Sequence, residues 1–120
     1  TYYNNLGLVY YARKNYDDAE KNLSRAIALQ PDFFEARNNL SLIYMSRGRY
    51  QKALEELEQA LSANQDNPGI YFNLALVYLR GFKNSERAMF YLKESLKMTH
   101  HVASDEMLHV ALKNLERNGT

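Results

Sequence analysis

The side chains most able to do chemistry form a run of carboxylates at Glu55, Glu56 and Glu58. Two carboxylates held close together can act as a general acid and a general base. The same segment also carries apolar residues at the spacing of one helical face, namely Ala53, Leu57, Ala60 and Leu61. Because that stripe must face a core, we expect the three glutamates to lie on the opposite, solvated face rather than in an active site.

The histidines are the second group that could do chemistry. They are His100, His101 and His109, and the last two could meet across a loop to hold a surface metal ion. The sequence lacks the helical zinc spacing of two histidines four residues apart beside a glutamate, a glycine-rich phosphate loop and a nucleophile motif. We therefore predict no catalytic residue, no metal site and no cofactor, with the histidines at helix ends and in loops.

Composition restricts the partners. Among 120 residues, 15 are Lys or Arg and 14 are Asp or Glu, which gives a net charge of +1 and predicts no nucleic-acid partner. No apolar run approaches the roughly 18 residues that span a bilayer, so we expect no direct membrane insertion. The chain has no cysteine. It opens at Thr1 without Met, which suggests a piece of a longer protein. The compartment of this soluble domain therefore stays open, with the cytoplasm slightly favoured.

One short line of sequence occurs three times. Asn5–Tyr10, Asn39–Tyr44 and Asn73–Tyr78 follow one another at intervals of 34 residues. The interval continues in Arg13 and Arg47, Tyr16 and Tyr50, Ala19 and Ala53, Leu23 and Leu57, and Ala26 and Ala60. In the third copy the interval slips to 35, so one residue is inserted in the stretch 81–85. A fixed interval of this length predicts a repeated supersecondary unit.

The period and the residue sizes resemble the tetratricopeptide repeat, a helix–turn–helix unit of 34 residues. The first copy fills the motif of that family with Tyr3, Leu6, Gly7, Tyr10, Ala19, Leu23, Ala26 and Pro31. The second copy departs from it at Arg37, Ser41 and Gln65, and the third at Ala75, Ser95 and His100. The resemblance covers nearly the whole chain.

The resemblance implies an all-α solenoid of three repeats plus a C-terminal capping helix, seven helices in a right-handed superhelix. We expect one domain over 1–120, with repeats 2–33, 34–67 and 68–101 and a capping helix 104–118. The expected helices are Tyr2–Lys14, Asn15–Leu29, Phe33–Arg47, Tyr50–Ala63, Pro68–Arg80, Ser85–Met98 and Asp105–Asn118, the last closed by Gly119. Gly48 should end the third helix, and Asn67 and Ser85 should cap the fifth and sixth.

In this family the first helix of each pair lines the concave side. The resemblance therefore implies a peptide-binding groove lined by Asn5, Leu8, Tyr11, Asn38, Asn39, Leu42, Met45, Phe72, Asn73, Leu76 and Leu79. Members that bind chaperones hold a C-terminal carboxylate with Lys, Arg and Asn. The matching positions here are Asn4, Leu8, Asn39, Gly69 and Asn73, without a basic residue. We expect a ligand with apolar side chains. Whether the asparagines contact it or support the fold stays open.

The sequence thus predicts a non-catalytic module that binds a peptide or partner protein. One alternative is a structural spacer or self-association segment of a longer solenoid, because no helix is expected to cover the N-terminal face around Tyr3 and Tyr10. Another is the regulatory arm of a larger enzyme. The sequence does not distinguish the three.

Overall fold

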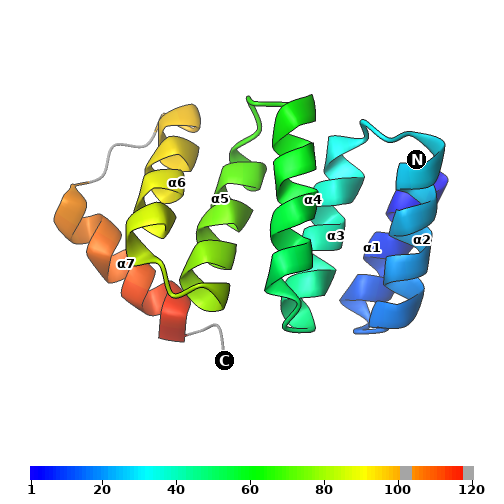
Figure 1. Cartoon of the computed structure of the whole chain (residues 1–120), viewed down its shortest axis with the longest axis horizontal. Helices are drawn as coiled ribbons and strands as arrows, with labels where there is room; N and C mark the ends of the chain where they lie inside the picture. Colours follow the sequence, from blue (N-terminus) through cyan, green and yellow to red (C-terminus); the bar gives the residue numbers. More distant parts are fainter. Residues whose placement is uncertain (101–103, 118–120) are drawn as a thin grey trace. The chain divides into compact units, whose positions relative to one another are not determined.

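The computed structural model describes residues 1–100 and 104–117. Their helices are, in order, α1 (Tyr2–Ala12), α2 (Tyr16–Leu29), α3 (Phe34–Ser46), α4 (Tyr50–Ala63), α5 (Pro68–Leu76), α6 (Ser85–Met98) and α7 (Asp105–Arg117), with a π-helical turn at Val77–Gly81 after α5 (Figure 1). The described residues contain no strand, which confirms the all-α prediction. None of the helices is long and apolar enough to cross a membrane within the described ranges.

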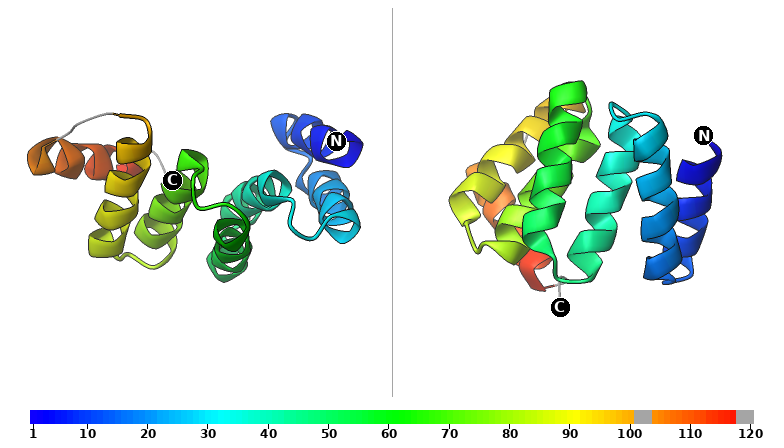
Figure 2. Two further views of the ribbon diagram at one scale, coloured as in Figure 1. Left: turned by 90° about the horizontal axis from the view of Figure 1, so that it is seen from above. Right: turned by 45° about the vertical axis from the view of Figure 1, so that its right-hand side comes forward.

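The chain divides into two compact units, Thr1–Gln65 and Asp66–Thr120. Unit 1 holds α1 to α4, and unit 2 holds α5 to α7. Within unit 1 the hairpins α1–α2 and α3–α4 are seen end-on in Figure 2. The division into repeats 2–33, 34–67 and 68–101 inside one domain stays a prediction.

The predicted helix bounds agree with the structure to within one or two residues in the first two repeats. The bounds of α4 and α6 are those expected, whereas α1 and α3 end slightly earlier. The capping helix predicted over 104–118 is α7, which ends at Arg117; Asn118 and Gly119 lie outside the described residues.

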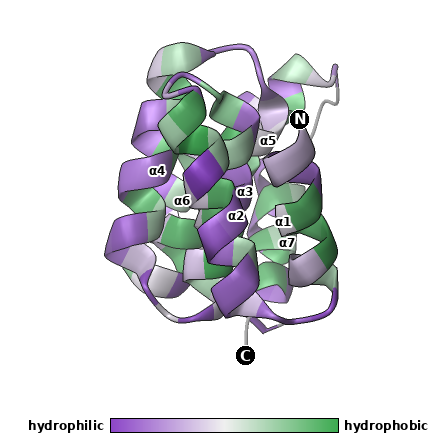
Figure 3. Ribbon diagram, turned by 90° about the vertical axis from the view of Figure 1, so that its right-hand side faces the viewer, coloured by the Kyte–Doolittle hydropathy of each residue, from purple (hydrophilic) through white to green (hydrophobic). Residues whose placement is uncertain are grey.

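A close approach of α1 and α2 at Gly7 sets the core of unit 1. A Cβ atom on Gly7 would lie 2.6 Å from Cγ of Leu23, and Leu23 is fully buried. α1 is apolar over most of its surface, and α2 alternates polar and apolar positions (Figure 3). The core therefore joins the second-helix stripe predicted from sequence to α3, through Ala19, Leu23, Ala26, Phe33, Ala36, Leu40 and Ile43.

The turn inside each repeat follows one design. Lys14, Gly48 and Lys83 all have positive φ, at 61°, 73° and 52°. The next residue then donates its main-chain N–H back to a tyrosine carbonyl, as Asn15 does to Tyr10 at 2.9 Å. Arg49 does so to Tyr44 at 2.8 Å, which confirms Gly48 as the residue that ends the third helix.

The residue inserted in the third repeat is taken up by the π turn at Val77–Gly81. A π turn is an α-helix with one extra residue in a single turn. The same closing hydrogen bond forms, from Asn84 to Tyr78 at 2.8 Å, but it spans six residues instead of five. The sequence located the insertion in 81–85, after the turn in which the structure absorbs it, because the helical pattern continues through the turn.

Unit 2 is closed by α7. Leu108 and Leu112 are buried with residues of α5, α6 and the π turn, namely Ala75, Leu79, Ala88 and Leu92. Asn67 caps α5 as predicted, since its Oδ1 accepts from Ile70 N at 3.2 Å and Pro68 follows it. The prediction that Ser85 caps α6 is wrong. Asn84 does so, accepting from Arg87 N at 3.1 Å, because the π turn shifts the start of the helix.

Gly7→Ala should destabilise the chain. The added methyl group would overlap buried Leu23, and overpacking of this kind costs about 1–3 kcal/mol. The measurement is the free energy of unfolding in urea. Ser41→Ala is the matched control, because Ser41 holds the same place in the second repeat and already carries a Cβ. A Gly7→Ala chain as stable as the parent would contradict the close approach, since alanine is the better helix former.

Lys14→Gly should stabilise the chain by about 1 kcal/mol, because glycine adopts the left-handed conformation without a Cβ clash. Lys14→Ala is the matched control: it removes the same charge but keeps the Cβ, and should bring no gain. Thermal unfolding of the three chains makes the comparison. An equal rise in Tm for both variants would mean that the charge, not the backbone conformation, is responsible.

Candidate binding surfaces

The residues predicted to line a groove differ in exposure within unit 1. α1 exposes Asn5 and Leu8, the latter with 39% of its surface accessible, and half-buries Tyr11 against Tyr16 at a ring distance of 5.9 Å. α3 half-buries Asn38, Asn39 and Leu42. Met45 is buried, so its side chain is not available on an open surface as the sequence had suggested.

A hydrogen bond joins the two first helices of unit 1. Nδ2 of Asn39 donates to Oδ1 of Asn4 at 3.0 Å. Asn4 is buried, with only 7% of its surface accessible, so this bond satisfies a polar group that water does not reach freely. Asn39 therefore has a structural role between neighbouring repeats, which was one of the two roles left open by the sequence. Its neighbours Asn5, Leu8 and Leu42 stay accessible in whole or in part.

In unit 2, α5 and the π turn place most predicted groove residues inside. Phe72 is exposed at 36%, but Asn73, Leu76 and Leu79 are buried. Leu79 belongs to the core that α7 closes through Leu108 and Leu112, which is why it does not line an open surface. Asn73 also has an interaction partner. Of the predicted set, the accessible part in this unit is Phe72.

The glutamate run does not form a catalytic pair. Glu55 and Glu58 are exposed as predicted. Glu56 differs from the prediction, because its Oε1 accepts from Nη1 of Arg37 at 2.8 Å and both side chains are largely covered. Within residues 1–100 and 104–117, no three His, Asp or Glu side chains are placed to hold a metal ion. His101 lies outside these ranges, so the pairing considered with His109 is not described.

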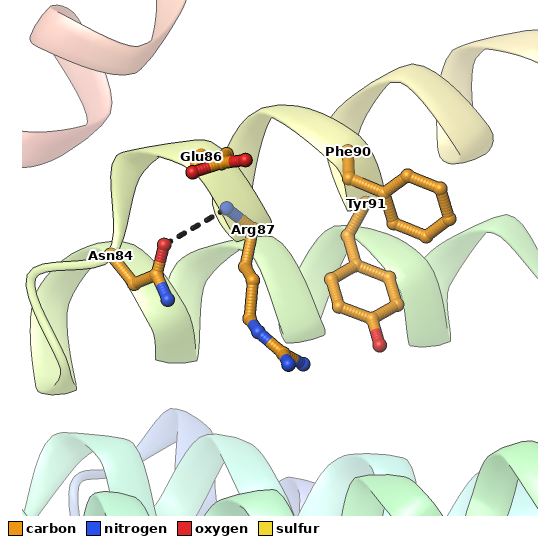
Figure 4. A pocket seen from close by; sticks show the side chains of 5 residues that line it. All are labelled: Asn84, Glu86, Arg87, Phe90 and Tyr91. Carbon is orange, nitrogen blue, oxygen red and sulfur yellow. Dashed lines mark hydrogen bonds between the residues drawn. The ribbon is translucent and has the colours of Figure 1, made fainter.

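A second surface, which the sequence did not indicate, lies between α6 and α7. We call it the α6–α7 groove. It has a volume of about 540 Å³, and its lining is Ser85, Glu86, Met89, Phe90, Lys93, Asp105, His109 and Leu112. Phe90 is 56% exposed in it and meets Tyr91 edge-on at 5.2 Å. A smaller hollow of about 390 Å³ shares Phe90 and Glu86 (Figure 4).

An ion pair crosses the α6–α7 groove. Nζ of Lys93 lies 2.9 Å from Oδ1 of Asp105, and the hydrogen bond from Lys93 lowers the pKa of the Asp105 carboxyl below its usual range. Both side chains are well exposed, so the pair contributes little to stability. The sequence does carry a signal for this groove. Phe90 stands where the other repeats have Lys21 and Glu55, an aromatic residue in place of two charged ones.

Comparisons with known proteins agree with the repeat pattern. A family model described as "Tetratricopeptide repeat" matches residues 4–68, and a second with the same description matches 44–101. The chain belongs to the tetratricopeptide repeat family. A comparison with curated protein sequences finds no match. Family and fold together support a protein-interaction module, and such repeats are generally non-catalytic.

Several solved structures are similar to this tetratricopeptide repeat chain. A crystal structure of MamA is 30% identical, with a TM-score of 0.74 over 82% of this chain and 57% of its own. The Sgt2 TPR domain of Aspergillus fumigatus has a TM-score of 0.80 at 20% identity, over 97% of this chain and 76% of its own. SycD, a type III secretion translocator chaperone of Yersinia enterocolitica, has 0.79 at 16%, over 98% and 88%. The last two show the fold alone.

Asn39→Ala should lower the free energy of unfolding by about 1–3 kcal/mol, because it leaves the buried Oδ1 of Asn4 without its donor. Asn5→Ala is the matched control and should be nearly neutral, since Asn5 is exposed on the same helix as Asn4. A cycle with Asn4→Ala measures the coupling of the pair by urea unfolding. Additive effects of the two substitutions would argue against the bond.

Proposed function

We propose that this tetratricopeptide repeat chain binds a peptide or partner protein through the first helices of its repeats. The observation that supports it most is the exposure of Leu8, beside Asn5, on a helix that is tied to α3 through Asn4 and Asn39. Leu42 on α3 adds a half-buried apolar side chain. We call Asn5, Leu8, Asn38, Asn39 and Leu42 the first-helix surface of unit 1.

The chemistry of this surface favours a partner with apolar side chains. Leu8 and Leu42 can bury apolar area, and an exposed amide such as that of Asn5 can both donate to and accept from a peptide backbone. The first-helix surface carries no Lys or Arg, so it offers no clamp for a C-terminal carboxylate. Affinity should rest on buried apolar area and be in the micromolar range, about −8 kcal/mol at 1 μM.

A second candidate function is self-association or stacking in a longer solenoid. It is favoured by the exposure of Tyr2 at 71% and Val9 at 46%, both on α1. Large apolar side chains exposed together mark interaction sites more often than free surface. A contact of one end with another end could propagate, because it is not self-complementary.

Leu8→Ser should weaken peptide binding. Peptides selected from a random display library against the whole chain provide the ligand, and their Kd is measured by calorimetry. Loss of a buried leucine contact of about 1.5 kcal/mol corresponds to roughly tenfold in Kd. Leu29→Ser is the matched control: Leu29 is 69% exposed on α2 and lies outside the first-helix surface, so its loss should leave Kd unchanged. Equal effects of both substitutions would move binding away from this surface.

A further inference from the structure

The helix α7 repeats α3 at an interval of 68 residues, twice the repeat length. Leu40 of α3 and Leu108 of α7 take the same place, and both are buried, with 3% and 2% of their surface accessible. The interval also relates one further row of each helix. Arg37, Ser41 and Tyr44 of α3 correspond to Asp105, His109 and Leu112 of α7.

In unit 1 this row of α3 is covered by α4. Arg37 donates to Glu56 of α4 at 2.8 Å, and Nζ of Lys52 of α4 lies 5.7 Å from the centre of the Tyr44 ring. Ser41, between them, is fully buried. The second helix of the pair therefore occupies the side of α3 that these three residues form.

In unit 2 the corresponding row of α7 lines the α6–α7 groove instead. Asp105, His109 and Leu112 all border its volume of about 540 Å³. No helix among the described residues of this unit stands to α7 as α4 stands to α3. The groove thus coincides with the place that a further helix takes in the neighbouring repeat.

We propose that the α6–α7 groove binds one amphipathic helix of a partner protein, seated on α7 as α4 is seated on α3. Its apolar stripe packs on Phe90 and Met89, which α6 presents to the groove. This site is separate from the first-helix surface of unit 1, so the two can be tested independently.

Charge specifies the partner helix. In unit 1 the first helix supplies the cation, Arg37, and α4 supplies the anion, Glu56. At the corresponding position α7 has Asp105, so the sign is reversed and the partner supplies a Lys or Arg there. Lys93 does not exclude it, because the Asp105 side chain is 75% exposed beside it. Glu86 adds a second exposed carboxylate to the lining of the groove.

Size excludes another repeat helix of the usual kind. Gly7, Ser41 and Ala75 are the small residues at which a second helix approaches, and α7 has His109 at this place. At Gly7 even a Cβ would lie 2.6 Å from a leucine of the second helix. A helix with leucine at that position would therefore collide with the imidazole of His109. The partner helix carries alanine or glycine opposite it.

Two synthetic peptides provide the probe. One has the sequence of α4, Tyr50–Ala63, and the other has the same sequence with Glu56→Lys and Leu57→Ala. Each is titrated into the whole chain while amide chemical shifts are recorded. We expect the substituted peptide to bind about tenfold more tightly and to shift the signals of Phe90, Lys93 and His109. Shifts confined to Arg37 and Ser41 would mean that the peptide replaces α4, which would overturn the proposal.

Variants of the whole chain test the seat itself. Phe90→Ser should raise the Kd of the substituted peptide at least fivefold. Val110→Ser is the matched control, because Val110 is 55% exposed on α7 but does not line the groove, and it should leave Kd within twofold. Asp105→Lys should reverse the preference between the two peptides, with Tm recorded to confirm that α7 stays folded.

Two results would overturn the proposal. One is an unchanged Kd in Phe90→Ser, which needs no folding control because Phe90 is largely exposed. The other is a dimer of the chain alone, seen by light scattering and abolished by Phe90→Ser, which would show that a second copy fills the groove. Loss of binding in Leu8→Ser with normal binding in Phe90→Ser would support the first-helix surface and not this one.

Discussion

The approach of two helices at a residue without a large side chain determines most of this structure. At Gly7 there is no room for a methyl group against Leu23, so the axes of α1 and α2 come close enough to bury the whole second-helix stripe. Ser41 and Ala75 repeat the small residue, and Ala53 and Ala88 repeat the small residue opposite it. Because the approach recurs every 34 residues, the position of the large residues around it recurs as well.

The turn between the helices obeys a second constraint, which is a backbone hydrogen bond rather than a side-chain fit. A residue in the left-handed conformation lets the next N–H reach the carbonyl of Tyr10, Tyr44 or Tyr78. When the third repeat gains a residue, the bond persists and the helix widens into a π turn instead. The closing bond is therefore conserved at the cost of regular helix geometry, and the sequence locates the extra residue only approximately.

The fold could be predicted from the sequence because each repeat confirms the pattern of the others. The bounds of α4 and α6, the small residues and the cap at Asn67 all follow from spacing and residue type. The site was less predictable. The bonds of Asn39 with Asn4 and of Glu56 with Arg37 connect residues 35 and 19 positions apart, and no local pattern requires either bond. Leu79 reads as a groove residue until α7 is known to close the core over it.

A repeat protein also contains its own reference for what is unusual. Where one copy replaces charged residues with an aromatic one, as at Phe90 against Lys21 and Glu55, packing of the shared fold does not require the change. Where a terminal helix keeps the buried leucine of the pattern at Leu108 but has His109 at the small position, it can close the core on one side and cannot accept the usual second helix on the other. The two departures meet in the α6–α7 groove, because α6 contributes the aromatic residue and α7 the imidazole. Selection for stability alone would place a polar residue at the exposed position, since an apolar side chain there gains nothing from the fold.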